Sequence, residues 1–101
     1  MKNTPFNLKE EIHFHDKDFN STILLEDGER KLILFALDKE QIIPEHTTPV
    51  KAAIYVLEGH VKFFIENKMH VLKEGDMFFI PQDVVHHLKA DSKTKFIVMK
   101  I

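Results

Sequence analysis

The sequence predicts a single all-β domain, a sandwich or a barrel, over residues 1–101. Three observations predict this class. Short runs of β-branched, aliphatic and aromatic residues recur along the chain, and turn signals built on Gly, Pro, Asn and Asp separate them at close intervals. No segment has the 3.6-residue period of an amphipathic helix. A length of 101 residues suits one domain and leaves no room for a second.

The first predicted strand lies near the N-terminus. Residues 12–15 alternate Ile12 and Phe14 with His13 and His15, which is typical of an edge strand with one buried face. The two histidines share a face with H-x-H spacing. An exposed edge strand commonly carries such polar residues without a ligand role, so we expect no metal there.

The next predicted element is a hairpin. Residues 21–25 form a short strand, Asp27-Gly28 supplies the turn signal, and residues 31–37 form the return strand. The return strand is apolar on both faces and therefore needs a second cover. Either the N-terminal segment or a second copy of the chain can provide it, and we expect a symmetric homodimer.

The rest of the chain alternates short strands with turns. Pro44 and Pro49 argue against a helix after residue 41. In the strand after Gly59 the odd positions are apolar, so His60 is predicted to point to solvent. Strands are expected at residues 52–57, 61–65, 69–73, 77–80, 84–89 and 95–101, and turns at residues 58–59, 67–68, 74–76, 82–83 and 91–93.

Composition and charge exclude several classes of protein. The absence of cysteine excludes disulfides, thiolate nucleophiles and cysteine-ligated zinc. The net charge is −2 and the lysines are dispersed, so we expect no nucleic-acid partner. No apolar run approaches the roughly 18 residues that span a bilayer, and the N-terminus lacks an apolar signal core, so we expect no membrane partner and a cytoplasmic location. Seven histidines in 101 residues raise the question of a metal.

Two blocks each bring one histidine to the end of a strand. In the first, His46 lies thirteen residues before Gly59, with an apolar strand between them. In the second, five residues separate Gly75 from Pro81, and His86 follows five residues later. In this spacing the chain resembles a small single-domain cupin of the type-2, conserved-barrel kind. The resemblance implies one cupin domain over residues 1–101, folded as a jelly-roll β-barrel, also called a double-stranded β-helix.

The resemblance also implies a metal site, although with an incomplete ligand set. In cupins, three imidazoles and one carboxylate converge on the metal. Here His46 and His86 match the first and last histidines, whereas Thr48 stands at the second histidine position and Ala52 at the glutamate position. A divalent Fe, Mn, Ni, Zn or Cu ion between His46 and His86 is therefore one expectation, and a metal-free pair of cavity histidines is the other.

The remaining departures lie next to these ligand positions. Asp83 replaces a usual glycine and Ala90 a usual asparagine. Glu45 and His87 adjoin the two histidines, and neighbours in a regular strand face opposite sides, so neither is expected to complete the site. The motifs around Pro44, His46 and His86 look like those of short, stand-alone bacterial cupins, in which the second histidine and the glutamate are also typically absent. Most of these have no assigned activity, so the resemblance implies the fold and a dimer and no particular reaction.

Three functions remain open at this stage. The first is binding of a small molecule in a barrel cavity beside His46 and His86. The second is a metal-dependent enzyme, dioxygenase-like or isomerase-like, for which no catalytic residue is assigned. The third is a ligand sensor that acts through a partner. The further residues predicted to line the cavity are Thr48, Ile54, Val56, Phe63, Phe78 and Leu88, together with His70, for which both the inward and the outward orientation stay open.

Overall fold

The computed structural model describes residues 3–101, and almost every regular element in it is a β-strand. A three-residue 3-10 helix, η1 (Leu8–Glu10), precedes the strands. Within residues 3–101 there is no helix long and apolar enough to cross a membrane. The strands are β1 (Asn20–Asp27), β2 (Arg30–Leu37), β3 (Ile42–His46), β4 (Ala52–Glu58), β5 (His60–Ile65), β6 (Lys68–Lys73), β7 (Met77–Ile80), β8 (His86–Ala90) and β9 (Thr94–Lys100).

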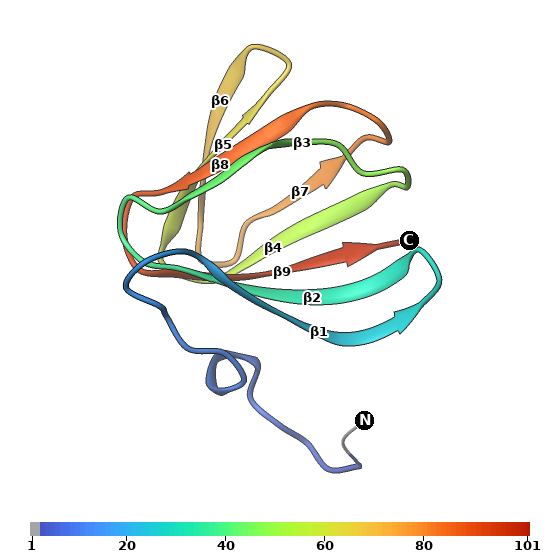
Figure 1. Cartoon of the computed structure of the whole chain (residues 1–101), viewed down its shortest axis with the longest axis vertical. Helices are drawn as coiled ribbons and strands as arrows, with labels where there is room; N and C mark the ends of the chain where they lie inside the picture. The colour runs from blue at the N-terminus through green and yellow to red at the C-terminus, as the bar shows by residue number, and fades with distance from the viewer. Residues whose placement is uncertain (1–2) are drawn as a thin grey trace.

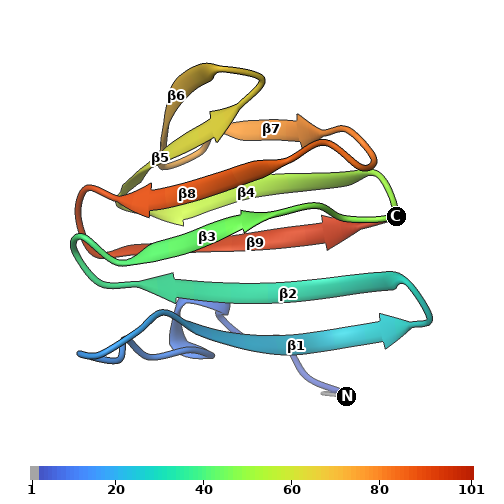
Figure 2. The same ribbon diagram turned by 45° about the horizontal axis from the view of Figure 1, so that its top comes forward.

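The strands form two antiparallel sheets that face each other (Figure 1). One sheet has five strands in the order β1-β2-β9-β4-β7, and the other has four in the order β3-β8-β5-β6. From β2 to β5 and again from β6 to β9, each strand crosses to the opposite sheet, as can be followed in Figure 2. This crossing between two sheets is the jelly-roll arrangement that the resemblance implied.

The main core fills the space between the two sheets. Strand alternation sends every second side chain into this space, so Phe63 of β5 and Phe96 of β9 are completely buried. Phe35 of β2 stacks on Phe96 with ring centroids 5.1 Å apart. Both rings belong to the same sheet and pack in the core cluster that also contains Val61, Phe63 and Leu88 of the other sheet, so the inner face of β2 is covered.

The N-terminal segment covers part of the outer face of the five-stranded sheet (Figure 1). Ile12 is 3% exposed and packs on Leu34, Ala36 and Ile97. The expectation that a second copy covers this part of β2 is therefore corrected, because the chain's own N-terminal segment does so. The strand predicted at residues 12–15 is also wrong: that segment is irregular, although Ile12 and Phe14 face the sheet and His13 and His15 are exposed.

The hairpin turns follow from residues that tolerate positive φ. Gly28 has φ +62° at the first central position of the two-residue β1–β2 loop. The β5–β6 turn is made by Glu66 and Asn67, with φ +52° and +61°, one residue earlier than predicted. His60 is exposed, as predicted, and its Nδ1 lies 3.0 Å from the Ser92 hydroxyl.

Candidate functional site

Strand pairing places His46 directly opposite His86. The two residues are partners in the β3–β8 ladder, and their ring centroids are 4.2 Å apart in an edge-to-face arrangement. Ile43 pairs with Leu88, so three residues of β3 span the distance that two residues of β8 span. This bulge changes which face the next side chain takes, and it turns His46 to the same side as Ile43. Pro44, which cannot donate to a ladder, lies inside the bulge of this edge strand.

Both imidazoles are fixed by the same local contact. His46 Nδ1 lies 2.9 Å from the Pro44 carbonyl, and His86 Nδ1 lies 2.9 Å from the Val84 carbonyl. A carbonyl oxygen only accepts, so each Nδ1 carries the hydrogen and donates it. The Nε2 atoms are left for other partners, and in the neutral rings each offers a lone pair.

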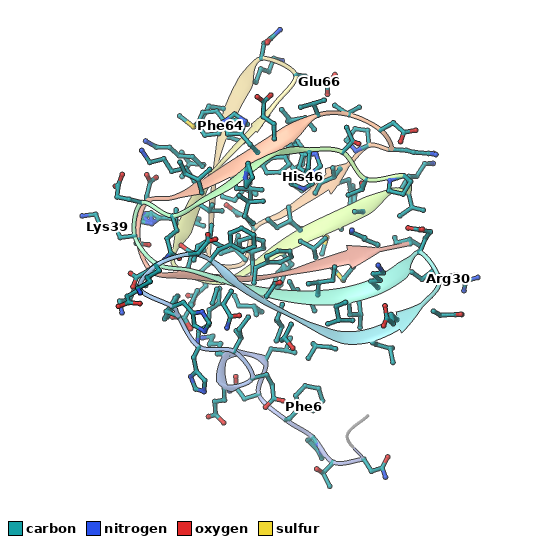
Figure 3. The ribbon with its side chains drawn as sticks, viewed as in Figure 1. Phe6, Arg30, Lys39, His46, Phe64 and Glu66 are labelled. Carbon is teal, nitrogen blue, oxygen red and sulfur yellow. The ribbon has the colours of Figure 1, made fainter. Side chains whose placement is uncertain are left out.

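The two rings line a small cavity between the sheets. Its volume is about 60 Å³. His86 is 3% exposed and deeply placed, whereas His46 is exposed and lies nearer the mouth. Figure 3 shows His46 on the side of β3 that faces the five-stranded sheet. The other lining residues are Phe35, Ile43, Thr48, Ala52, Ile54, Phe63, Ile80, Leu88, Phe96, Val98 and Lys100.

Four of the seven further residues predicted from the sequence line this cavity: Thr48, Ile54, Phe63 and Leu88. Val56 and Phe78 were expected there and do not line it, and neither does His70, whose orientation the sequence left open. Val56 is fully buried in the core.

An aromatic contact explains the position of His70. Its cross-strand partner Phe63 points inward, so His70 takes the inner side as well. The His70 ring packs on Phe78 with centroids 4.9 Å apart, and Phe78 packs on Phe63 at the same distance. Two phenyl rings therefore separate His70 from His86, which meets Phe63 at 5.5 Å.

One backbone hydrogen bond joins the two histidine blocks, and a side-chain bond braces the first. The Asp83 N–H donates to the Thr48 carbonyl at 2.8 Å, and the Thr48 hydroxyl donates to the Val50 carbonyl at 3.0 Å. Asp83 has φ +61°, a left-handed conformation that glycine adopts freely and aspartate tolerates. The aspartate in place of a usual glycine therefore preserves the turn that brings the second block beside the first.

Seven of the lining residues were not predicted from the sequence, and the charged one among them is Lys100 on β9. Phe96, Val98 and Lys100 occupy alternate positions of this strand and share its inner face. The alternation in residues 95–101 was available as a signal, but a lysine at the end of a strand is usually assigned to solvent. Lys100 adds an ammonium group to a cavity that otherwise offers two imidazoles and a hydroxyl.

The donor set does not fit a firmly held transition metal. Anchored Nδ1 atoms and free Nε2 atoms are the usual condition of metal-bound histidines, so His46 and His86 supply two suitable nitrogens. Protein-held ions normally have at least three protein ligands. Within residues 3–101 no group of three or more His, Asp or Glu side chains is placed to hold an ion, and Lys100 adds a repelling charge to the cavity.

Burial lowers the pKa of His86 below its ordinary value of 6.5, and the nearby charges of His46, Lys100 and His87 act in the same direction. The hydrogen bond to the Val84 carbonyl opposes this shift only in part. At pH 7 the His86 ring is therefore neutral. Its free Nε2 is then an acceptor rather than a donor.

We predict that this shift makes the folded state less stable in mild acid. As pH falls below 6.5, the unfolded chain takes up a proton at residue 86 before the folded chain does, so the free energy of unfolding falls. The slope contributed by this one group is at most about 1.4 kcal/mol per pH unit. Urea unfolding between pH 5 and 7.5 measures it, and His86→Gln should have a shallower slope. Equal slopes for the two proteins contradict the prediction.

Comparisons with known proteins agree with this architecture. A family model described as a cupin domain matches residues 33–101. No curated protein matches the chain. A conserved protein of unknown function from Streptococcus pyogenes is similar in structure, with a TM-score of 0.89 and 23% identity over 99% of this chain and 89% of that one.

Two further solved structures show the same fold. A cupin superfamily protein from Desulfitobacterium hafniense has a TM-score of 0.92 at 15% identity, covering 100% of this chain and 93% of that one. An RmlC-like cupin from Desulfovibrio desulfuricans has a TM-score of 0.85 at 24% identity, covering 97% and 95%. The family match extends over more than half of the sequence and includes both histidine blocks, so the chain belongs to the cupin domain family.

Proposed function

We propose that this protein binds a small polar molecule in the cavity between His46 and His86. The observation that carries the proposal is the pair of rings, 4.2 Å apart, whose Nδ1 atoms are held by backbone carbonyls. This anchoring leaves the two Nε2 atoms to orient a ligand. A ligand site typically combines apolar walls with a few fixed polar groups, and Ile54, Phe63 and Leu88 provide such walls here.

The proposed ligand is small. Pockets that bind drug-sized molecules measure roughly 300–1,000 Å³, whereas this cavity measures about 60 Å³. An apolar cavity of about 150 Å³ holds one benzene molecule. We therefore infer a ligand with few non-hydrogen atoms, or a ligand group of that size that enters past His46.

Binding is also better supported than the metal-dependent enzyme considered above. That alternative requires a third ligand beside His46 and His86, and the cavity offers Thr48 and Lys100 instead. The Thr48 hydroxyl is neutral and therefore a weaker ligand than an imidazole or a carboxylate, and Lys100 adds a positive charge. The polar groups are thus arranged to hold and orient a molecule.

The test is a thermal-shift screen with small alcohols, amides, carboxylates and carbonyl compounds, and with Mn²⁺, Ni²⁺ and Zn²⁺. A compound that binds only the folded state at about 100 times its Kd stabilises that state by about 2.7 kcal/mol. We expect at least one stabiliser, with its effect lost in His86→Gln and retained in His60→Gln, which alters an exposed histidine outside the cavity. A flat screen, or a stabiliser equally effective on His86→Gln, contradicts the proposal.

We further propose that the protein forms a homodimer through the uncovered part of the five-stranded sheet. Cross-strand neighbours Leu25, Leu32, Met99, Ala53 and Phe79 form an apolar row across its outer face, in which Ala53 is already buried and Leu32 and Met99 are partly buried. Phe79 at one end is 77% exposed and Leu25 at the other is 48% exposed. Burial of this row against a second copy removes apolar surface from water.

Light scattering at micromolar concentration is expected to give twice the 11.9 kDa of one chain, and Phe79→Lys is expected to give one chain. A wild-type particle of about 12 kDa rules out the dimer.

A further inference from the structure

Lys100 lines the cavity, and its charge lies close enough to affect His86. It also borders a surface groove lined by Glu26 and Asp27. Five other lysines form ion pairs with carboxylates. Within residues 3–101, Lys100 forms no such ion pair. Its cross-strand neighbour is Lys31, which adds a second positive charge at this end of the sheet. No acidic side chain described by the structure lines the cavity.

The other polar groups of the cavity require a ligand group that donates a hydrogen bond. His46 and His86 both donate through Nδ1 to backbone carbonyls, so their Nε2 atoms accept hydrogen bonds when the rings are neutral. The Thr48 hydroxyl has donated its proton to Val50 and also has only acceptor capacity left. A complementary ligand must therefore bring an anionic acceptor for Lys100 and a hydrogen-bond donor for an imidazole.

We propose that the ligand is a small 2-hydroxycarboxylate, with its carboxylate on Lys100 and its hydroxyl donating to Nε2 of His86 or His46. This inference rests on the proposed function and names the chemical class that the site takes. A carboxylate on an ammonium forms a charge-assisted hydrogen bond, roughly twice as strong as a neutral one. Glycolate, with five non-hydrogen atoms, is the simplest member of the class and suits a cavity of about 60 Å³.

Calorimetric titration with glycolate and with acetate tests the inference, because acetate has the carboxylate and lacks the hydroxyl. We expect glycolate to bind at least about tenfold more tightly than acetate, since one further hydrogen bond is worth on the order of 1 kcal/mol. Lys100→Gln is expected to weaken glycolate binding at least about tenfold through loss of the charge. Lys89→Gln is the matched control, because Lys89 lies on the outer face of β8 and pairs with Glu40.

The possible results distinguish failure of the proposed ligand class from failure of the proposed binding function. If glycolate and acetate bind equally well, or if Lys100→Gln binds glycolate as tightly as the wild type, the proposed ligand class is wrong. A stabiliser from the screen that depends on His86 would still support the binding function. Zn²⁺ binding that depends on both histidines and tightens in Lys100→Gln also overturns the ligand class, because the cavity is then a cation site. Absence of binding by every probe in the screen removes both proposals. Unfolding curves of each variant confirm that the chain remains folded.

Discussion

Gly59→Ala is expected to lower the free energy of unfolding by about 2–5 kcal/mol. Gly59 has φ +77°, and a left-handed conformation costs a residue with a Cβ roughly 1–2 kcal/mol. The added methyl group would also overlap the backbone carbonyl of Lys93 and lie 2.8 Å from the Thr94 hydroxyl oxygen. Overpacking of this kind costs roughly 1–3 kcal/mol. The free energy of unfolding of a small domain is about 5–15 kcal/mol, so this loss is a large part of the total stability.

Gly28→Ala separates the two contributions to this loss. Gly28 has φ +62°, but a Cβ there meets nothing within 4 Å. We therefore expect a loss of roughly 1–2 kcal/mol from the backbone conformation alone. Urea unfolding of both variants gives the comparison. Equal losses would show that the contact with Lys93 and Thr94 does not oppose the substitution.

Phe63→Ala is expected to be the second large change, with a loss of about 3–5 kcal/mol. Phe63 is completely buried, packs on Phe78 at 4.9 Å and lies 5.5 Å from the His86 ring. Removing the ring forfeits its burial and leaves space that the two sheets cannot close. Because Phe63 also lines the cavity beside His86, the variant should admit larger ligands than the wild type.

Phe64→Ala is the matched control for this prediction. Phe64 follows Phe63 in β5 but faces outward, where its half-buried ring stacks parallel to His87 at 4.3 Å. We expect a loss of about 1 kcal/mol, the value typical of an exposed aromatic pair. Denaturant midpoints measured at one pH give both values. A Phe63→Ala loss no greater than that of Phe64→Ala would mean that the inner face of β5 does not carry the core.

The strands that were predicted well have strict alternation and a clear turn on each side. β5 illustrates this, because Val61, Phe63 and Ile65 are buried and His60 is exposed, as the period of two requires. Residues 12–15 show where alternation misleads. Ile12 and Phe14 do pack on the sheet, yet the segment is not a strand. A segment that lies on the face of a sheet can show the same alternation of apolar and polar residues without forming hydrogen bonds to a neighbouring strand.

The candidate site was only partly predictable for a related reason. Thr48, Ile54, Phe63 and Leu88 line the cavity as expected. Two of the three failures, Phe78 and His70, concern side chains whose position depends on a neighbouring ring, whereas Val56 is buried in the core. The Phe78 ring lies between Phe63 and His70. The local sequence pattern does not predict that aromatic rings fill this space.

The sequence by itself determined the all-β class, the order of most strands and turns, and the two histidine blocks, because these depend on local preferences and on short-range alternation. The tertiary structure alone decided that His46 faces His86. Strict alternation from Ile43 turns Glu45 inward, and only the bulge formed when β3 pairs with β8 reverses this. It also decided that Lys100 shares the cavity, since the position of β9 between β2 and β4 is set by long-range pairing. Which strands become neighbours depends on the burial of the whole chain, and that is not encoded in any single segment.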